Sequence, residues 1–119
     1  MKKVNTKNFK KTLSKFSTGI TVVCVKNNNS IYGKTVNSFN SLSLNPPMVL
    51  FSLGNYSSSI KQFSKTKFLS INILSSKQKK LSDNFASTAS KLENIKFIES
   101  KNKTPIIPNC IANLECELI

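Results

Sequence analysis

Histidine is absent from this sequence of 119 residues, and acidic residues are scarce. Without histidine, the chain cannot form a Ser-His-Asp triad, a Cys-His nucleophile or the usual zinc sites. The acidic residues are too scattered to predict a pair of catalytic carboxylates. They are Asp83, Glu93, Glu99, Glu115 and Glu117. We therefore expect no metal site and no catalytic side chain, and we expect the chemistry to come from a bound cofactor.

Arginine is absent as well, so all eighteen basic residues are lysine and the formal net charge is +13. A strongly basic chain often binds nucleic acid or an anionic membrane surface. Here the bidentate guanidinium group that reads guanine edges or clamps phosphates is missing. The lysines are spread along the whole chain, beside abundant asparagine, serine and isoleucine, which is typical of a compositional bias. We therefore expect no specific nucleic-acid partner.

Long apolar runs are missing too. None approaches the ~20 residues of a membrane span, and the lysine-rich N-terminus leads into a short amphipathic pattern instead of a signal-peptide core. Cys24, Cys110 and Cys116 form no Cys-x-x-Cys pair, so we expect buried, reduced thiols. With 39% hydrophobic residues, the chain predicts one soluble, cytoplasmic domain over residues 1–119, without a membrane partner.

Short runs rich in β-branched residues predict most of the strands. The run 20–25 favours a buried strand, and the asparagine-rich segment 27–30 predicts a turn into an antiparallel partner that begins at Ile31. Pro46-Pro47 predicts the entry to a strand over 48–53. The other expected strands are 68–74, 95–98 and 110–119, with a loop or frayed helix end at 87–94 and a loop at 100–109.

Three short helices are expected around these strands. The first is capped by Asn5 or Thr6, the second carries Ile60 and Phe63, and the third follows Ser75 or Ser76. The apolar faces of the first and third helices carry Phe9, Leu13 and Phe16, and Leu81 and Phe85. Because many short strands occur without regular strand–helix alternation, a small antiparallel barrel is the favoured architecture.

The segment Gly33–Ser43 stands out as a polar turn between two strands, and we interpret it as a ligand-gripping turn. Six short polar side chains alternate there with apolar residues that anchor the segment. The polar residues are Thr35, Asn37, Ser38, Asn40, Ser41 and Ser43, and the apolar residues are Val36, Phe39, Leu42 and Leu44. The alternative is a serine-rich surface turn whose hydroxyls satisfy local backbone groups.

A second polar cluster contains Asn55 and Ser57-Ser58-Ser59 and precedes the short helix with Ile60 and Phe63. Free backbone N–H groups at the start of a helix attract an anion. Simple N-capping explains one serine but not three. Asn72 interrupts an apolar strand, where it either contacts a ligand or bonds to a neighbouring loop.

Four segments, in this order, resemble the flavin reductase-like family with the FMN-binding split-barrel fold. They are Phe16 to Val23 (FSTGITVV), Thr35 to Phe39 (TVNSF) with Ser41 to Ser43 (SLS), Asn45 to Val49 (NPPMV) and Ile71 to Leu74 (INIL). The resemblance covers roughly residues 9 to 86. It implies a mainly β, Greek-key-like antiparallel split β-barrel with a few short flanking helices, which forms a homodimer.

The resemblance also implies a function. Members bind FMN or FAD and use NAD(P)H to reduce the flavin, often for a partner monooxygenase. The residues that it places at the flavin are Thr35, Val36, Asn37, Ser38, Ser41, Leu42, Ser43, Asn55, Ser57, Ser58, Ser59 and Asn72. Ser41, Ser43 and the cluster Ser57–Ser59 are candidates for the flavin phosphate, with Lys61 adding charge.

The chain departs from the family pattern at its C-terminus. Members usually continue past the position of Glu115–Ile119 with a Gly-Asp-His segment, which nothing here matches. We therefore expect a C-terminally shortened domain. This departure supports an alternative function, a flavin-binding or degenerate non-enzymatic protein without reductase activity. Lys34 occupies a place where the family usually has a small or apolar residue.

Overall fold

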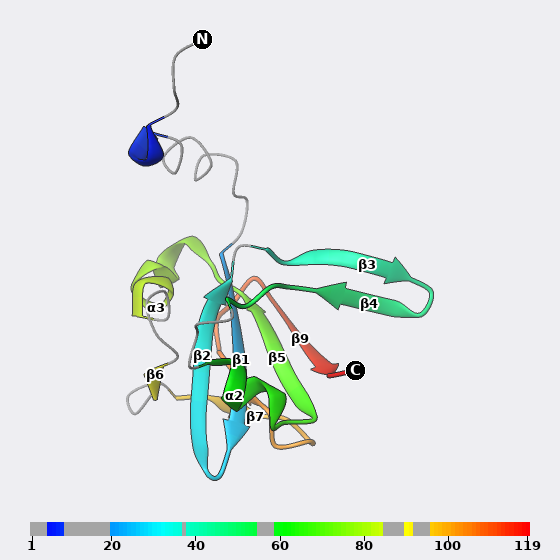
Figure 1. The fold of residues 1–119 in the computed structure, drawn as a ribbon. Helices are drawn as coiled ribbons and strands as arrows, with labels where there is room; N and C mark the ends of the chain where they lie inside the picture. Colours follow the sequence, from blue (N-terminus) through cyan, green and yellow to red (C-terminus); the bar gives the residue numbers. More distant parts are fainter. Residues whose placement is uncertain (1–4, 9–19, 37, 55–58, 85–89, 92–95) are drawn as a thin grey trace.

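The computed structural model describes residues 5–8, 20–36, 38–54, 59–84, 90–91 and 96–119. Figure 1 shows an antiparallel sheet with one hairpin projecting from its upper end. The elements are β1 (Thr21–Asn27), β2 (Ser30–Val36), β3 (Asn40–Leu44), β4 (Pro47–Leu50), α2 (Ser59–Ser64), β5 (Phe68–Ile73), the 3-10 helix η1 (Ser76–Gln78), α3 (Lys79–Asn84), β6 (Ser90–Lys91), β7 (Ile98–Glu99), β8 (Pro105–Ile106) and β9 (Ala112–Glu117).

The main sheet has the strand order β6-β2-β1-β5-β9, and every pair in it is antiparallel. Strand β1 lies at its centre because its β-branched residues pack well on both faces of a pleated sheet. The side chains from Thr21 to Val25 are all buried. The prediction of a mainly β, antiparallel fold is therefore confirmed.

The turn between β1 and β2 also matches its prediction. Asn28 and Asn29 have φ angles of 50° and 65°. A two-residue hairpin turn whose twist matches that of the strands needs positive φ at both positions, which asparagine tolerates better than most residues. The asparagine-rich segment therefore fixes the register of the hairpin, with Asn27 opposite Ser30.

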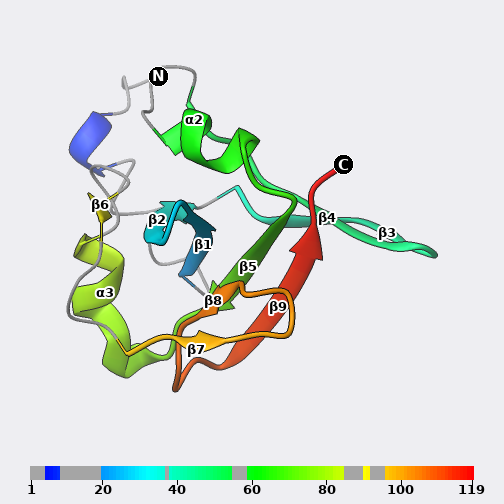
Figure 2. The ribbon, with the colours of Figure 1, turned by 90° about the horizontal axis from the view of Figure 1, so that it is seen from below.

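The sheet carries a separate hydrophobic cluster on each face. Val23, Val25 and Ile71 belong to one cluster, with Phe63 of α2 packed among them. Val22 and Cys24 belong to the other, together with Ile107, which follows β8. Figure 2 shows α2 on one side of the sheet and the β7–β8 pair on the other. Alternating residues of β1 therefore bury both faces, as expected for a central strand.

The segment Gly33–Ser43 is not a single turn, and this prediction is wrong. Its first four residues belong to β2, and its last four belong to β3, which pairs with β4 in the projecting hairpin. Asn45 and Pro46 form the turn of this hairpin, and β4 ends at Leu50 instead of residue 53. Serine and asparagine are uncommon in strands, but here they lie on an exposed hairpin, where polar side chains stay hydrated.

The remaining elements lie close to their predictions. Strands β5 and β9 fall inside the expected runs, and β7 begins at the end of its expected run. Strand β6 interrupts the expected loop or frayed helix end 87–94, because its two residues pair with β2. Strand β8 interrupts the expected loop 100–109, because its two residues pair with β7. In the described part of the chain, no helix is both long and apolar enough to cross a membrane.

The helix starts also agree with the sequence. The Asn5 Oδ1 atom accepts hydrogen bonds from the N–H groups of Lys7 (2.8 Å) and Asn8 (3.4 Å), so Asn5 caps the N-terminal helical turn. Helix α2 carries Phe63 in the core as expected. The predicted apolar residues Phe9, Leu13, Phe16 and Phe85 lie outside the described residues.

A buried asparagine ties the sheet together. Asn72 in β5 is fully buried, and its Nδ2 donates to the Val22 carbonyl oxygen (3.0 Å) and to Ser70 Oγ (2.9 Å). Its Oδ1 accepts from Ile107 N (3.1 Å) and from Asn113 Nδ2 (2.7 Å). A side-chain amide has two donor hydrogens and two acceptor lone pairs. All four are used, and they join β1, β5, β9 and the segment after β8.

We predict that Asn72→Ala destabilises the protein by about 3 kcal/mol or more. The substitution leaves the buried Ile107 N–H group without its acceptor and breaks three further bonds, and each unsatisfied buried group costs about 1–3 kcal/mol. Urea unfolding followed by circular dichroism measures the change. As a control, Asn40→Ala on the exposed hairpin should shift stability by about 0.5 kcal/mol or less. Equal effects of the two substitutions would contradict the structural role of Asn72.

Candidate functional site

Ser38 of the first predicted polar cluster bonds to the segment that follows β4. The N–H group of Ser52 donates to Ser38 Oγ (2.7 Å), and Ser38 Oγ–H donates to the Ser52 carbonyl oxygen (3.4 Å). This link joins the segment after β2 to the segment after β4, three residues before the second cluster begins. Asn37, Asn55, Ser57 and Ser58 lie outside the described residues, so their predicted contacts stay predictions.

The side chains at the end of β2 make structural contacts within the protein. Thr35 Oγ1 donates to the Ser82 carbonyl oxygen of α3 (2.8 Å), and Val36 is buried in the core. Strand β6 pairs with the outer edge of β2 only at Tyr32 and Gly33. Beyond Gly33, no strand in the described part of the chain pairs with that edge. The main chain of Thr35 and Val36 is therefore suited to the polar edge of a ligand.

The projecting hairpin carries Ser41, Leu42 and Ser43 away from Thr35. All three lie on β3, where the register shifts between Ser41 and Ser43, so that Leu42 occupies a bulge and is 57% exposed. A bulge redirects the side chains around it. Ser41 is exposed and Ser43 is half-buried, so these hydroxyls are accessible from the hairpin surface. The structure therefore separates the predicted residues into two groups, one at the end of β2 and one on β3.

The last two predicted residues differ in position. Ser59 is the first residue of α2, as expected, but Asn72 lies in the middle of a buried strand. Because the Asn72 amide uses all its hydrogen-bonding capacity inside the protein, it offers no free polar atom to a ligand. The geometry thus favours the alternative in which Asn72 bonds to a neighbouring loop.

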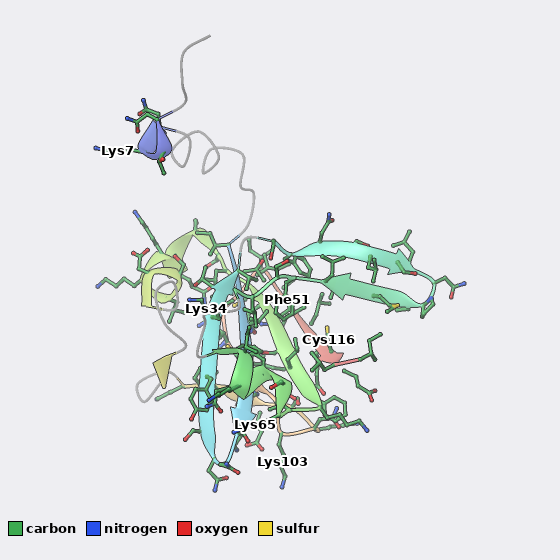
Figure 3. All side chains as sticks on the ribbon, viewed as in Figure 1. Lys7, Lys34, Phe51, Lys65, Lys103 and Cys116 are labelled. Carbon is green, nitrogen blue, oxygen red and sulfur yellow. The ribbon has the colours of Figure 1, made fainter. Side chains whose placement is uncertain are left out.

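An apolar groove of about 370 Å³, which the sequence reasoning missed, opens between β4, α2, β5 and β9. Phe51 and Phe63 line it and pack edge to face, with ring centroids 6.5 Å apart. Cys116 lines it from β9, and Figure 3 labels Phe51 and Cys116 at this face of the sheet. Ser52 lies between Phe51 and Leu53, so the groove borders the Ser38–Ser52 link.

A sequence signal for this groove exists in two short alternations. Val49, Phe51 and Leu53 repeat with a period of two, and so do Cys116 and Leu118. Such alternation places apolar side chains on one face of extended backbone. These runs predict the strands, but the sequence does not show that the apolar face of residues 49–53 meets the apolar face of residues 116–118.

The three thiols are poorly suited to nucleophilic chemistry. Burial raises the pKa of the Cys24 thiol far above its ordinary value, and burial also raises the pKa values of Cys110 and Cys116. A raised thiol pKa lowers the thiolate fraction at neutral pH, and the thiolate is the reactive form. All three cysteines are free. In the residues that the structure describes, no group of three His, Cys, Asp or Glu side chains is placed to hold a metal ion.

Comparisons with known proteins agree with this fold. The family model for the flavin reductase like domain matches residues 13–119. The chain is 36% identical over 112 residues to the FMN reductase (NADH) SmoA of Agrobacterium fabrum, covering 94% of this chain and 64% of that protein. It is 32% identical over 114 residues to HsaB, the reductase subunit of a flavin-dependent monooxygenase of Mycobacterium tuberculosis, covering 95% of this chain and 61% of that protein.

The structural comparison leads to the same group. The flavin reductase PheA2 superposes with a TM-score of 0.80 at 34% identity, covering 98% of this chain and 75% of that chain. The split-barrel fold predicted from the sequence is therefore confirmed. The chain spans less than two thirds of the length of SmoA and HsaB.

Proposed function

The chain belongs to the flavin reductase-like domain family, and on this premise we propose that it binds FMN or FAD and reduces the flavin with NADH or NADPH. The observation that carries this proposal is the family match over residues 13–119, which includes every residue predicted to contact the flavin. The Ser38–Ser52 link supports it, because it joins the end of β2 to a residue that precedes the second predicted polar cluster by three positions in the sequence.

The described residues fit the two kinds of surface that a flavin needs. At Thr35 and Val36, where no strand of the described residues pairs with the outer edge of β2, the main chain offers donors and acceptors for the polar edge of the ring system, and the groove at Phe51 and Leu53 offers apolar surface nearby. Ser41 and Ser43 hold hydroxyls for the phosphate side, together with the cluster Asn55–Ser59 and the exposed Lys61. Side-chain hydroxyls and a lysine ammonium group are suited to bind phosphate oxygens.

The bound flavin supplies the hydride acceptor, so the chain needs no nucleophile of its own. This agrees with a sequence that lacks histidine and with thiols whose pKa values are raised. The chain's residues then have three tasks. Thr35 and Ser38 fix the end of β2 against α3 and against the segment after β4, the main chain orients the ring, and apolar side chains exclude water.

The proposal extends to partners and location. Because HsaB is the reductase subunit of a flavin-dependent monooxygenase, we include the supply of reduced flavin to such an enzyme. We also include a homodimer, because the projecting hairpin exposes Leu42 (57%) and Leu44 (89%), and exposed apolar side chains of this kind are typical of an interface. A cytoplasmic location fits a protein whose cysteines are all free thiols.

We predict FMN-stimulated oxidation of NADH or NADPH by the purified chain, at about 1 per second or faster. Steady-state absorbance of the nicotinamide measures this rate, and an anaerobic mixture of protein, flavin and nicotinamide should lose its flavin absorbance promptly. Bound flavin that is not bleached would support the non-enzymatic alternative. Absence of any flavin binding would refute both functions.

The double substitution Asn37→Ala with Ser38→Ala should weaken flavin binding about thirtyfold. Each lost neutral hydrogen bond is worth on the order of 1 kcal/mol, and Ser38 also holds the segment after β4 in place. Titration of flavin fluorescence gives the affinity, and circular dichroism reports whether the fold is kept. Ser76→Ala, on the exposed side of η1, is the matched control and should leave the affinity unchanged. Unchanged affinity of the double variant would indicate that the flavin binds elsewhere on the protein.

Leu44→Lys should shift the proposed homodimer towards the monomer of 13.2 kDa and weaken association at least tenfold. A charge placed at the exposed tip of the hairpin must be desolvated when a second copy covers it. Sedimentation equilibrium measures the change. Ile98→Lys on β7 is the control, since Ile98 is also exposed (55%) but lies on another pair of strands. A wild-type chain that is monomeric at all concentrations would contradict the homodimer.

A further inference from the structure

A polar pocket of about 190 Å³ lies at the end of the sheet opposite the β3–β4 hairpin. It is bordered by the β1–β2 turn, by the connection from α2 to β5 and by the turn over residues 101–104. We propose that this pocket binds a compact anion with more than one phosphoryl group, for which inorganic diphosphate is the simplest example. The proposal is independent of the flavin function.

Four lysines from three separate segments line the pocket, and two of them have acidic neighbours. Lys26 Nζ lies 3.8 Å from Glu99 Oε1, and Lys67 Nζ lies 3.6 Å from Glu117 Oε1. Both pairs are solvent-exposed to a large degree, so they balance charge without holding the lysines rigidly. These two ammonium groups are largely compensated before a ligand arrives.

The other two lysines, Lys65 and Lys103, are not compensated in this way. In the described part of the chain, no carboxylate lies within 4.0 Å of either ammonium group. Figure 3 labels both residues at the same end of the sheet, one following α2 and the other in the turn after β7. The carboxylate of Glu115 accepts a hydrogen bond from Asn102 of the same lining. Two ammonium groups that line one polar pocket and make no ion pair within the described residues favour an anion of at least two negative charges.

The backbone around the pocket is held in place by hydrogen bonds. Asn27 Nδ2 donates to Gln62 Oε1 (3.0 Å), which joins the end of β1 to α2. Lys103 N donates to the Ser100 carbonyl oxygen (3.0 Å), and Thr104 N donates to Ser100 Oγ (3.1 Å). Lys103 adopts φ 60°, a conformation that glycine or asparagine takes at lower cost. The turn therefore presents this lysine from a fixed backbone.

The size and lining of the pocket select the class of anion. Its volume corresponds to roughly six water molecules, and lysine, asparagine and threonine dominate its wall. The one aromatic ring, Phe68, lies under the ammonium group of Lys67, with 5.5 Å between Nζ and the ring centroid. Apart from Phe68 and the lysine stems, the lining in the described part of the chain is polar, which favours a ligand without a base or another ring. Lysine binds phosphate as a point charge, which suits a compact tetrahedral group.

The test is a titration of the full ¹⁵N-labelled chain with inorganic diphosphate, followed through amide chemical shifts. We expect saturable shifts confined to residues 26–28, 65–68 and 102–104. The double variant Lys65→Gln with Lys103→Gln should lower the affinity tenfold or more. The control variant Lys77→Gln with Lys79→Gln removes the same charge from an exposed surface near η1 and should change the affinity less than twofold.

Three results would overturn the proposal. The first is equal weakening in both double variants, which would indicate attraction to the overall positive charge. The second is shifts spread over lysines elsewhere on the surface. The third is sulfate binding as tightly as diphosphate at equal ionic strength, which would indicate an unspecific anion site. Because Lys65 and Lys103 lie away from the proposed flavin contacts, flavin affinity should be the same in both variants, which keeps this test separate from the flavin function.

Discussion

The buried amide of Asn72 is the constraint on which the rest of the structure depends. A polar side chain inside a sheet is costly unless every donor and acceptor finds a partner. Asn72 finds its partners in β1, in β9 and in the segment after β8, so these parts must take one arrangement relative to β5. Ser70 adds a bond of 2.6 Å to the Pro105 carbonyl oxygen on the same face. The position of β9 follows from this network, and β9 forms one wall of the apolar groove.

The hydroxyl groups near the end of β2 work in a similar way. Thr35 binds α3, and Ser38 binds the segment after β4, so both side chains hold backbone segments together. Thr35 and Ser38, which the sequence predicted as ligand contacts, thus hold parts of the protein together. In the proposed site, ligand contacts are therefore assigned to the main chain at Thr35 and Val36 and to hydroxyls on β3. A rigid frame of this kind is what a cofactor site needs, because the cofactor carries the chemistry and the protein orients it.

Much of the sheet could be predicted because the signals are local. The β-branched run of β1 and the asparagine turn after it specify a hairpin without help from the rest of the chain. Strand β3 could not be predicted, since it is polar and its pairing is decided by its partner β4. The sequence also did not decide the role of Asn72, because that role depends on partners far away in the chain. Its deciding partners, Ile107 and Asn113, are 35 and 41 residues away in the sequence.

The lysines show most clearly what a sequence leaves undecided. Eighteen lysines spread along a chain with no arginine suggest a compositional bias, and the sequence gives no reason to single out Lys26, Lys65, Lys67 or Lys103. Folding brings these four together around one polar pocket, and within the described residues two of the four form ion pairs with a carboxylate. Lysines that are scattered along the sequence therefore form a local group of positive charges at this pocket because of the chain topology. The sheet ends with two chemically different surfaces, an apolar groove beside a hydroxyl link and a lysine-lined pocket away from the hairpin, and neither is visible before the strands are placed.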